Sequence, residues 1–566
     1  MTRRLLILLI ILLSFTLRCF PQIIEDDSKL REIVKQDGQV EVTIPLTDKR
    51  TLDDLTRNVS ILSVRDKLVY ISLSPLTVEW FILQKFNYLV VDKIKNKGVV
   101  TALNINEAWD WETYPTYSQY DSIMQSFVTI YPDLCHLDTI GTSINGQLVL
   151  ALKISDNAGT DEDEPEVFYS STMHGDELAG YVLMLRLMDY LLKNYNLNNR
   201  VKYLVDNLEI WINPLANPDG TYNTGNTITS PTRYNANSYD LNRNFPDPIT
   251  PNTVKQKETL DMIKFMGKHR FVLSANFHSG AEVVNYPWDR WFSKFHADDS
   301  WFYNISREYA DTVQFYSGTG YMTDENEGVT RGAEWYIAYG TRQDFVTWEL
   351  HGREVTIEID VIKETPAAQL DLLWQYNWRS FLGYLENALY GIHGMVLDSR
   401  TDVPVPAKVF ITGHDKDSSH VYSDTLTGSF IRLLEPGLWD LTFSANGYHD
   451  TTFTDLTVFS GQKTDIVVNL TPLANRIDTT IPAIPTLYPN PAKTVIYAVL
   501  PDKMTGNLNV KVVNQSGMLI SDYITEAVQG IPVSIDVKKL SGGIYTVIFI
   551  NTDTKIICRS RFIVVK

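Results

Sequence analysis

The feature that most restricts the fold of this chain is a change of sequence pattern near Gly391. Between residues 110 and 390, apolar runs of strand length alternate with segments of helical periodicity. After Gly391, short stretches alternate apolar with polar residues, and turn residues separate them. Interleaved strands and helices favour one α/β domain, whereas short alternating strands favour β-sandwiches. The sequence therefore predicts two kinds of architecture in series.

The region 110–390 carries the signals of a mixed sheet covered by helices. Buried strands are predicted at Glu166–Ser171, Leu208–Asn213, Phe271–Phe277 and Glu354–Ile359. Helices are predicted at Tyr117–Tyr131, Glu177–Tyr195 and Asp371–Tyr390. The Asn145-Gly146 pair is typical of a two-residue hairpin turn, so residues 141–154 are predicted to form a hairpin.

Units of other composition flank this region, as the length of 566 residues allows. Residues 23–105 have a small α+β pattern, with two hypotheses open: a prosegment that masks a site, or a folding or spacer domain. Residues 391–472 and 487–566 read as all-β sandwiches, and the Pro/Thr-rich segment 473–486 as a linker. The predicted fold class is α/β: a mixed-sheet α/β/α domain preceded by the α+β unit and followed by the two sandwiches.

The N-terminus has the pattern of a secretory signal peptide, residues 1–22. Arg3 and Arg4 precede an apolar run, Leu5–Leu17, that is too short to cross a bilayer comfortably. Arg18 directly before Cys19 argues against lipidation at that cysteine. Cleavage beyond Cys19 would leave two cysteines in different predicted domains, so we expect an exported protein without a disulfide framework.

The net charge of −18 disfavours nucleic acid and anionic lipid as partners. It would attract a cationic substrate, although the same acidity also serves plain solubility.

A candidate metal site is spread over two segments. His174 and Glu177 are three positions apart where a strand is predicted to end and a helix to begin, and His278 ends another apolar strand. Ligands in open α/β sheets bind at such strand ends. Two imidazoles and one carboxylate suit zinc and leave a fourth position for water, which is the catalytic arrangement.

The loops between these segments hold further polar residues. Asn217-Pro218-Asp219-Gly220 is by itself typical of a turn. Arg243 and Asn242 could bind a carboxylate through a planar fork and an amide, and Arg233 could reach the same cleft.

In this order, the motifs resemble those of the zinc metallocarboxypeptidase (funnelin) family. The resemblance is greatest to its regulatory subgroup of carboxypeptidases D, N and E, and it covers about residues 112–472. In that subgroup a transthyretin-like β-sandwich follows the catalytic domain, as residues 391–472 would here.

The resemblance implies one zinc ion per chain and a set of residue roles. It assigns His174, Glu177 and His278 as zinc ligands, with Asp240 orienting the first of them. It makes Glu358 the general base and Arg233 the group that polarises the scissile carbonyl. The residues that it implies for substrate binding are Asn242, Arg243, Tyr336, Asp289 and Gln343.

Two of these assignments have rivals among their neighbours. Strand alternation puts Glu354 and Asp360 on the same face as Glu358, so parity does not exclude either as the base. Asp289 favours release of Lys or Arg, but the basic residue Arg342 would oppose that preference if it faced the pocket.

The C-terminal unit resembles the type IX secretion sorting domain of Bacteroidetes. Tyr488-Pro489-Asn490-Pro491-Ala492, Leu540–Tyr545 and a basic end at Lys566 carry this resemblance. It implies the type IX machinery as a partner and a secreted or cell-surface location.

The sequence thus predicts a secreted zinc metallocarboxypeptidase that removes C-terminal residues, Lys or Arg by preference, from peptides and proteins. Two alternatives stay open. The chain could be a hydrolase of the same fold that acts on cell-wall peptide amides, or an inactive peptide-binding or adhesion protein, against which the retention of all three ligand residues and Glu358 argues.

Overall fold

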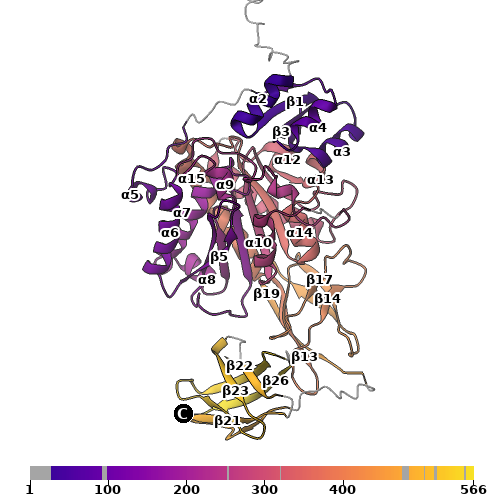
Figure 1. Ribbon diagram of the computed structural model, residues 1–566. Coiled ribbons are helices and arrows are strands. Elements are labelled where there is room, and N and C mark those ends of the chain that lie inside the picture. The colour runs from indigo at the N-terminus through magenta and orange to yellow at the C-terminus, as the bar shows by residue number, and fades with distance from the viewer. Residues whose placement is uncertain are drawn as a thin grey trace, which may run out of the picture.

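The computed structural model describes residues 27–91, 98–250, 254–318, 320–473, 484–501, 504–514, 519–553 and 556–566. The predicted signal peptide and most of the predicted linker lie outside these residues. Four sheet-containing units follow one another along the chain, and the first and last lie at opposite ends of the molecule (Figure 1). Among the described residues, no helix is both long and apolar enough to cross a bilayer.

The first unit is a four-stranded antiparallel sheet, with strand order β2-β3-β1-β4, packed against helices. Its elements are α2 (Asp27–Asp37), β1 (Val40–Pro45), α3 (Lys49–Asn58), β2 (Ser60–Arg65), β3 (Leu68–Leu73), α4 (Val78–Leu83) and β4 (Leu89–Val90). Val42 and Ile71 of the paired strands are fully buried against Leu30 of α2 and Phe81 of α4. The unit therefore has a hydrophobic core of its own.

The second unit is built on an eight-stranded mixed sheet with strand order β11-β10-β12-β9-β7-β8-β6-β5. The strands are β5 (Cys135–Thr142), β6 (Leu148–Ile154), β7 (Glu166–Ser171), β8 (Glu209–Asn213), β9 (Phe271–His278), β10 (Ala281–Tyr286), β11 (Val329–Arg331) and β12 (Arg353–Asp360). The four central strands β12, β9, β7 and β8 are mutually parallel. They are buried on both faces, which explains their continuous apolar runs.

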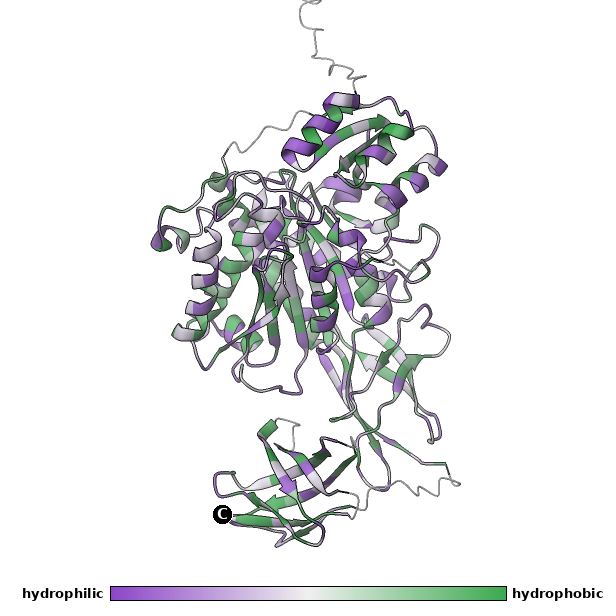
Figure 2. Ribbon diagram, in the orientation of Figure 1, coloured by the Kyte–Doolittle hydropathy of each residue, from purple (hydrophilic) through white to green (hydrophobic). Residues whose placement is uncertain are grey.

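Helices cover both faces of this sheet, so the predicted α/β/α class is confirmed (Figure 2). They are α5 (Ile105–Ala108), α6 (Tyr117–Ile130), α7 (Ala179–Asn194), α8 (Asn199–Val205), α9 (Pro218–Thr221), α10 (Lys257–Met266), α11 (Asp299–Ser317), α12 (Asp324–Gly328), α13 (Gly332–Trp335), α14 (Arg342–Glu349) and α15 (Leu370–Glu386). Three 3-10 turns, Leu241–Arg243, Ala367–Gln369 and Asn387–Leu389, complete the set. Helices α6, α7, α11 and α15 share one core with the sheet, and α10 and α14 share the other.

The third and fourth units are each made of two packed β-sheets. The third has sheets β16-β13-β19 and β15-β14-β17-β18, and the fourth β20-β21-β24 and β23-β22-β25-β26. The strands are β13 (Gly391–Asp398), β14 (Lys408–Ile411), β15 (Val421–Tyr422), β16 (Ser429–Arg432), β17 (Gly437–Ser444), β18 (Thr451–Val458), β19 (Lys463–Leu470), β20 (Thr486–Tyr488), β21 (Val495–Val499), β22 (Gly506–Asn514), β23 (Leu519–Ala527), β24 (Val533–Asp536), β25 (Gly543–Asn551) and β26 (Ile557–Val564).

A buried ion cluster joins the second and third units. Asp298, just before α11, accepts hydrogen bonds from Arg353 of β12 at 2.6 Å and from Arg432 of β16 at 2.7 Å. His414 lies 2.9 Å from the other oxygen of the same carboxylate. Two guanidinium groups thus neutralise a carboxylate that is almost fully enclosed, and they fix the sandwich against the mixed sheet.

Candidate metal centre

The site begins where β7 ends, at the edge of the sheet where the parallel strands terminate. Thr172 has a φ of +57°, an unusual value for a β-branched residue, and it turns the chain out of the strand. Gly175 follows, and a Cβ there would collide with the backbone of Gly220 in α9. The short Asn217–Gly220 turn, capped by the Asn217 side chain, therefore presses directly on the segment that carries His174 and Glu177.

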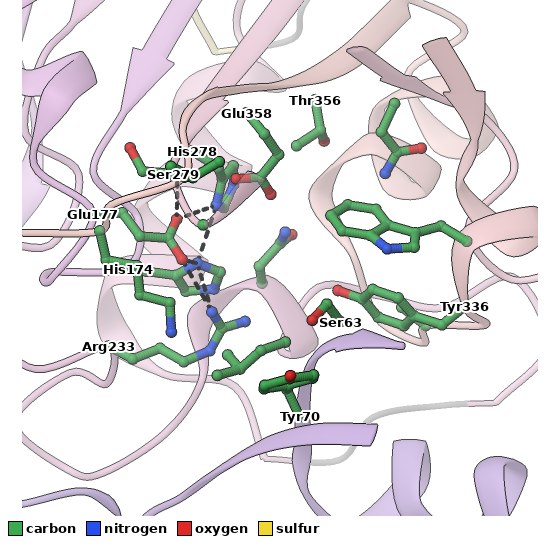
Figure 3. Close-up of a pocket in the computed structure, with 18 of the residues that line it drawn as sticks. Ser63, Tyr70, His174, Glu177, Arg233, His278, Ser279, Tyr336, Thr356 and Glu358 are labelled. Atoms are coloured by element: carbon green, nitrogen blue, oxygen red, sulfur yellow. Dashed lines mark hydrogen bonds and ion pairs between the residues drawn. The ribbon is translucent and has the colours of Figure 1, made fainter. Parts of the chain in front are cut away.

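Three side chains present their donor atoms to one point. His174 Nδ1 lies 2.8 Å from Glu177 Oε1, and His278 Nδ1 lies 2.7 Å from Glu177 Oε2. The two imidazole Nδ1 atoms are 3.0 Å apart. All three residues are at most 3% exposed. In Figure 3 they converge from two strand ends that are far apart in the sequence.

The remaining ring nitrogens are held by neighbouring polar groups. His174 Nε2 lies 3.1 Å from Asp240 Oδ1, the residue expected to orient it. His278 Nε2 lies 2.6 Å from the amide of Asn276, two residues earlier in β9. Asn276 was not predicted as a site residue, although strand alternation puts it on the same face as His278. Both imidazoles are thereby turned with Nδ1 toward the common point.

This donor set fits a zinc ion. Zinc accepts two nitrogen ligands and a carboxylate. Ligand atoms about 2.0–2.1 Å from a tetrahedral centre lie about 3.3 Å apart. The donor atoms here, 2.7–3.0 Å from one another, are close to that spacing. Burial lowers the pKa of His278 to about 4, which keeps its imidazole neutral and able to ligate. Burial would raise the pKa of Glu177, but His174 and His278 hold it well below its usual range.

A cavity of about 540 Å³ opens beside these three residues, and Glu358 lines it from β12. In Figure 3 Glu358 points toward the converging donors from the side opposite Arg233. Burial first, and then the charge of Glu177, raise the pKa of Glu358 well above its usual range. An ionised Glu358 in this environment would bind a proton strongly.

The two rival carboxylates of β12 are bonded elsewhere. Glu354 is fully buried and accepts hydrogen bonds from Arg342 Nε at 2.9 Å and Nη2 at 3.1 Å. Asp360 accepts from Thr365 Oγ1 at 2.5 Å and from the Ile362 amide. Of the three carboxylates, Glu358 is the one that lines the cavity. Because Arg342 is fully buried against Glu354, it does not face the pocket as one reading of the sequence allowed.

Arg233 lies against the candidate metal ligands. Its Nη1 is 3.1 Å from Glu177 Oε1, and its Nε donates to Asp240 Oδ2 at 2.9 Å. Burial would raise the pKa of Asp240, but Arg233 and His174 hold it well below its usual range. The carboxylate therefore stays ionised and neutralises the guanidinium.

Further along the cavity, the 3-10 turn Leu241–Arg243 brings Asn242 and Arg243 to the wall. Arg243 Nη2 lies 3.3 Å from the Tyr336 hydroxyl, and the amide oxygen of Asn242 accepts from the Arg342 backbone. The predicted carboxylate-binding residues thus lie next to Tyr336, which is also predicted to bind substrate.

Asp289, which follows β10, lines the cavity and faces Gly332 of α13. Its carboxylate accepts from Asn285 at 3.1 Å and from Gln343 at 3.1 Å, and burial raises its pKa. Gln343 lies behind Asp289 and holds it, whereas Asp289 itself lines the cavity. Gly332 faces the same carboxylate, and any side chain there would overlap with it.

The first unit closes one side of the cavity. Leu62, Ser63, Arg65 and Tyr70 of the β2–β3 hairpin line it together with the candidate metal ligands. Ser60 Oγ donates to Asp240 at 2.7 Å, and the Ile61 carbonyl accepts from Arg243 at 3.3 Å. Figure 3 shows Ser63 and Tyr70 of this hairpin next to Tyr336. None of these contacts could be anticipated from sequence patterns.

A mixed sheet between two layers of helices thus carries a His, Glu and His triad at its strand ends, together with a cavity-facing carboxylate and an arginine pair, an arrangement suited to a metal-dependent hydrolase. A zinc carboxypeptidase family model matches residues 120–380, and a secretion system C-terminal sorting domain model matches residues 486–565.

Several named proteins are similar to this chain. Carboxypeptidase D of Homo sapiens is 34% identical over 352 residues, which cover 59% of this chain and 25% of that protein. The carboxypeptidase N catalytic chain of Rattus norvegicus is 32% identical over 387 residues, covering 60% of this chain and 82% of that protein. Carboxypeptidase A from Helicoverpa armigera, a solved structure, has a TM-score of 0.48 at 16% identity and covers 62% of this chain and 98% of its own. The chain belongs to the zinc carboxypeptidase family, and it spans about a quarter of the length of carboxypeptidase D.

Proposed function

We propose that this chain is an exported metallocarboxypeptidase that binds one zinc ion and removes the C-terminal residue of peptides, preferring Lys or Arg. The observation that carries the proposal is the convergence of His174, Glu177 and His278 beside a cavity that also exposes Glu358 and Arg243. An inactive binding protein would have no need for a buried carboxylate with a raised pKa at this position.

In this proposal each residue around the cavity has its own role in peptide hydrolysis. A zinc ion held by the triad would lower the pKa of a bound water toward about 7 and polarise the scissile carbonyl. Glu358 accepts the proton of the attacking water and passes it to the departing amine. Arg233 stabilises the negative charge that develops on the carbonyl oxygen, and such a donor is typically worth about 3 kcal/mol.

Substrate choice follows from other residues that line the cavity. Arg243 and Asn242 bind the free terminal carboxylate, which restricts the enzyme to exopeptidase action. Asp289 is a buried carboxylate in the cavity wall, and an ammonium or guanidinium group of the substrate would neutralise its charge. The orientation of Arg342 toward Glu354 supports this preference, because no cation from that residue competes for Asp289.

Export follows from the terminal units. The match of residues 486–565 to a secretion system sorting domain supports delivery by type IX machinery to the exterior or the cell surface. Peptide and protein C-termini outside the cell are then the substrates.

Paired peptides ending in Lys, Arg, Phe or Glu, incubated with and without a chelator, test the proposal. Release of free Lys and Arg that stops on chelation is the expected result. Release of no terminal residue from any peptide would refute the enzyme assignment, and faster release of Phe than of Lys would refute the role of Asp289. Cleavage of cell-wall peptide amides in preference to these peptides would support the alternative hydrolase.

The first unit, residues 27–91 of the structure, acts as a mask for the site in this proposal. The Ile61 carbonyl stands at the guanidinium that would bind the substrate carboxylate, and Tyr336 packs against the core of the unit. Gln39 adds two contacts to the catalytic loops, donating to Asp176 at 3.0 Å and accepting from the Arg233 amide at 2.8 Å.

Masking is tested by comparing the full chain before and after limited proteolysis. If the mask holds, the rate of Lys release rises at least tenfold as the first unit is cut away, because substrate no longer competes with Ile61 for Arg243. Equal rates before and after removal would favour a folding or spacer role for this unit.

A further inference from the structure

A lysine in the cavity wall takes no part in the mechanism above. Lys363 lies in the loop that follows β12 and lines the cavity with Val361, Ile362 and Glu364. Its Nζ is 2.6 Å from Glu41 Oε1 of the first unit, and the two side chains are 16% and 21% exposed. The cationic partner belongs to the catalytic unit and the anionic partner to the mask.

The position of Lys363 along the cleft follows from the sheet. Asp289 lies beyond β10, on one side of Glu358, which is on β12. The Lys363 carbonyl accepts from the Leu178 amide at 2.9 Å, so its loop is tied to the start of α7, which follows β7 on the other side of β12. When the last residue of a peptide binds to Asp289 and Arg243, the residues before it therefore extend across Glu358 toward Lys363.

We infer that Lys363 forms a subsite for a carboxylate side chain of the substrate, located one or two residues before the bond that is cut. Glu41 occupies this subsite in the masked chain, as the Ile61 carbonyl occupies Arg243. The inference rests on the proposed carboxypeptidase function. It gives the enzyme a preferred substrate class: peptides that end in a basic residue preceded by an acidic one.

The electrostatic surroundings keep Lys363 available as a cation. Burial would lower its pKa, but Glu41, Asp176 and Glu177 raise it, so the side chain carries its charge at neutral pH. When a substrate replaces Glu41, a carboxylate of the substrate restores the lost ion pair. A neutral side chain of the substrate would leave the Lys363 ammonium without this partner. The Lys363 side chain is only 16% exposed, so water would solvate it poorly.

Full-length Glu41→Gln protein, in which Lys363 has lost its acidic partner, serves as the test background. The substrates are pairs of peptides that end in Arg. The two peptides of a pair differ only in having Glu or Gln at one of the two positions before the bond that is cut. At low salt we expect kcat/KM to be about fivefold higher for Glu than for Gln at one of these positions, as for a partly exposed ion pair. The ratio should approach 1 as the salt concentration rises, because salt screens the interaction.

Substitutions of Lys363 in this background identify the residue responsible. Lys363→Gln should bring the ratio to about 1, Lys363→Glu should reverse it, and Lys363→Arg should retain it. The circular dichroism spectrum and the urea unfolding midpoint of each variant show that it is folded. Lys294→Gln is the matched control, since Lys294 pairs with Asp417 at 2.9 Å and does not line the cavity.

The possible failures are distinct. Equal rates on Glu and Gln peptides in the Glu41→Gln background, or a preference that persists in Lys363→Gln, would overturn the subsite and leave the carboxypeptidase function intact. Release of no C-terminal residue from any peptide, including after proteolysis, would overturn both.

Discussion

Replacing Glu358 by Gln should separate metal binding from chemistry. The amide has nearly the same shape as the carboxylate but cannot accept a proton. Glu358 is outside the group of three donors that lie within 4.8 Å of one another, so the variant should keep its zinc affinity within about threefold. General base catalysis typically contributes about 10²–10⁴ in rate. We expect kcat to fall about a thousandfold, which corresponds to about 4 kcal/mol.

The assay combines release of Lys from a peptide with zinc competition against a chromophoric chelator. Glu354→Gln is the contrasting variant, because its carboxylate pairs with Arg342 in the interior. It should destabilise the protein by about 3–5 kcal/mol in urea unfolding, since it leaves a buried charge unpaired, while kcat per folded molecule stays near wild type. A Glu358→Gln enzyme that retains more than a tenth of its kcat, or loses zinc, would refute the assignment.

Three further outcomes follow from the contacts described. Asp240→Asn should weaken zinc binding about 10–100-fold, measured by chelator competition, because the charge that orients His174 is lost. Asp289→Asn should abolish the preference for Arg over Leu at the peptide terminus, seen as kcat/KM values that converge while zinc content is unchanged. Asp298 has a folded-state pKa well below its usual range: burial opposes this, but Arg432 and Arg353 outweigh it. Its stabilising contribution is therefore present above its unfolded pKa of about 3.9 and is lost as the pH falls through the lower folded value. The difference in unfolding free energy between wild type and Asp298→Asn should accordingly be constant from pH 5 to 7 and shrink below about pH 4; a difference independent of pH would contradict this account.

The central sheet could be predicted because its strands are buried on both faces. Such strands read as continuous apolar runs, and Glu166–Ser171 was predicted with the bounds that the structure has. The hairpin was less well placed: its first strand begins at Cys135 rather than Gly141, because β5 is an edge strand whose exposed residues interrupt the apolar pattern. Strand β2 was not predicted, since half of Ser60–Arg65 is polar.

The site shows where sequence patterns stop. Periodicity placed Glu354, Glu358 and Asp360 on one face of a strand, and it had no means of choosing among them. What distinguishes them is the residue that each one meets: Arg342, brought by α14, neutralises Glu354, while Thr365 bonds Asp360. These partners are set by packing between elements, which no local pattern encodes. Asn276 lies on the same face as His278 by the same parity argument, but no role was predicted for it, because a neutral amide in an apolar strand does not by itself indicate a metal or catalytic site.

The contacts of the first unit explain how the cationic residues of the cavity are paired in the absence of substrate. A cleft that concentrates Arg243 and Lys363 in a partly enclosed wall is costly to form unless acceptors meet these cations. The first unit supplies two of these acceptors, the Ile61 carbonyl and the Glu41 carboxylate. Under the proposed masking role, a substrate that displaces the first unit must offer equivalent acceptors at the same two places, and a peptide with a free C-terminus and an upstream acidic residue does so. The same pair of cations that holds the chain in its masked form would therefore select which peptides the unmasked enzyme accepts.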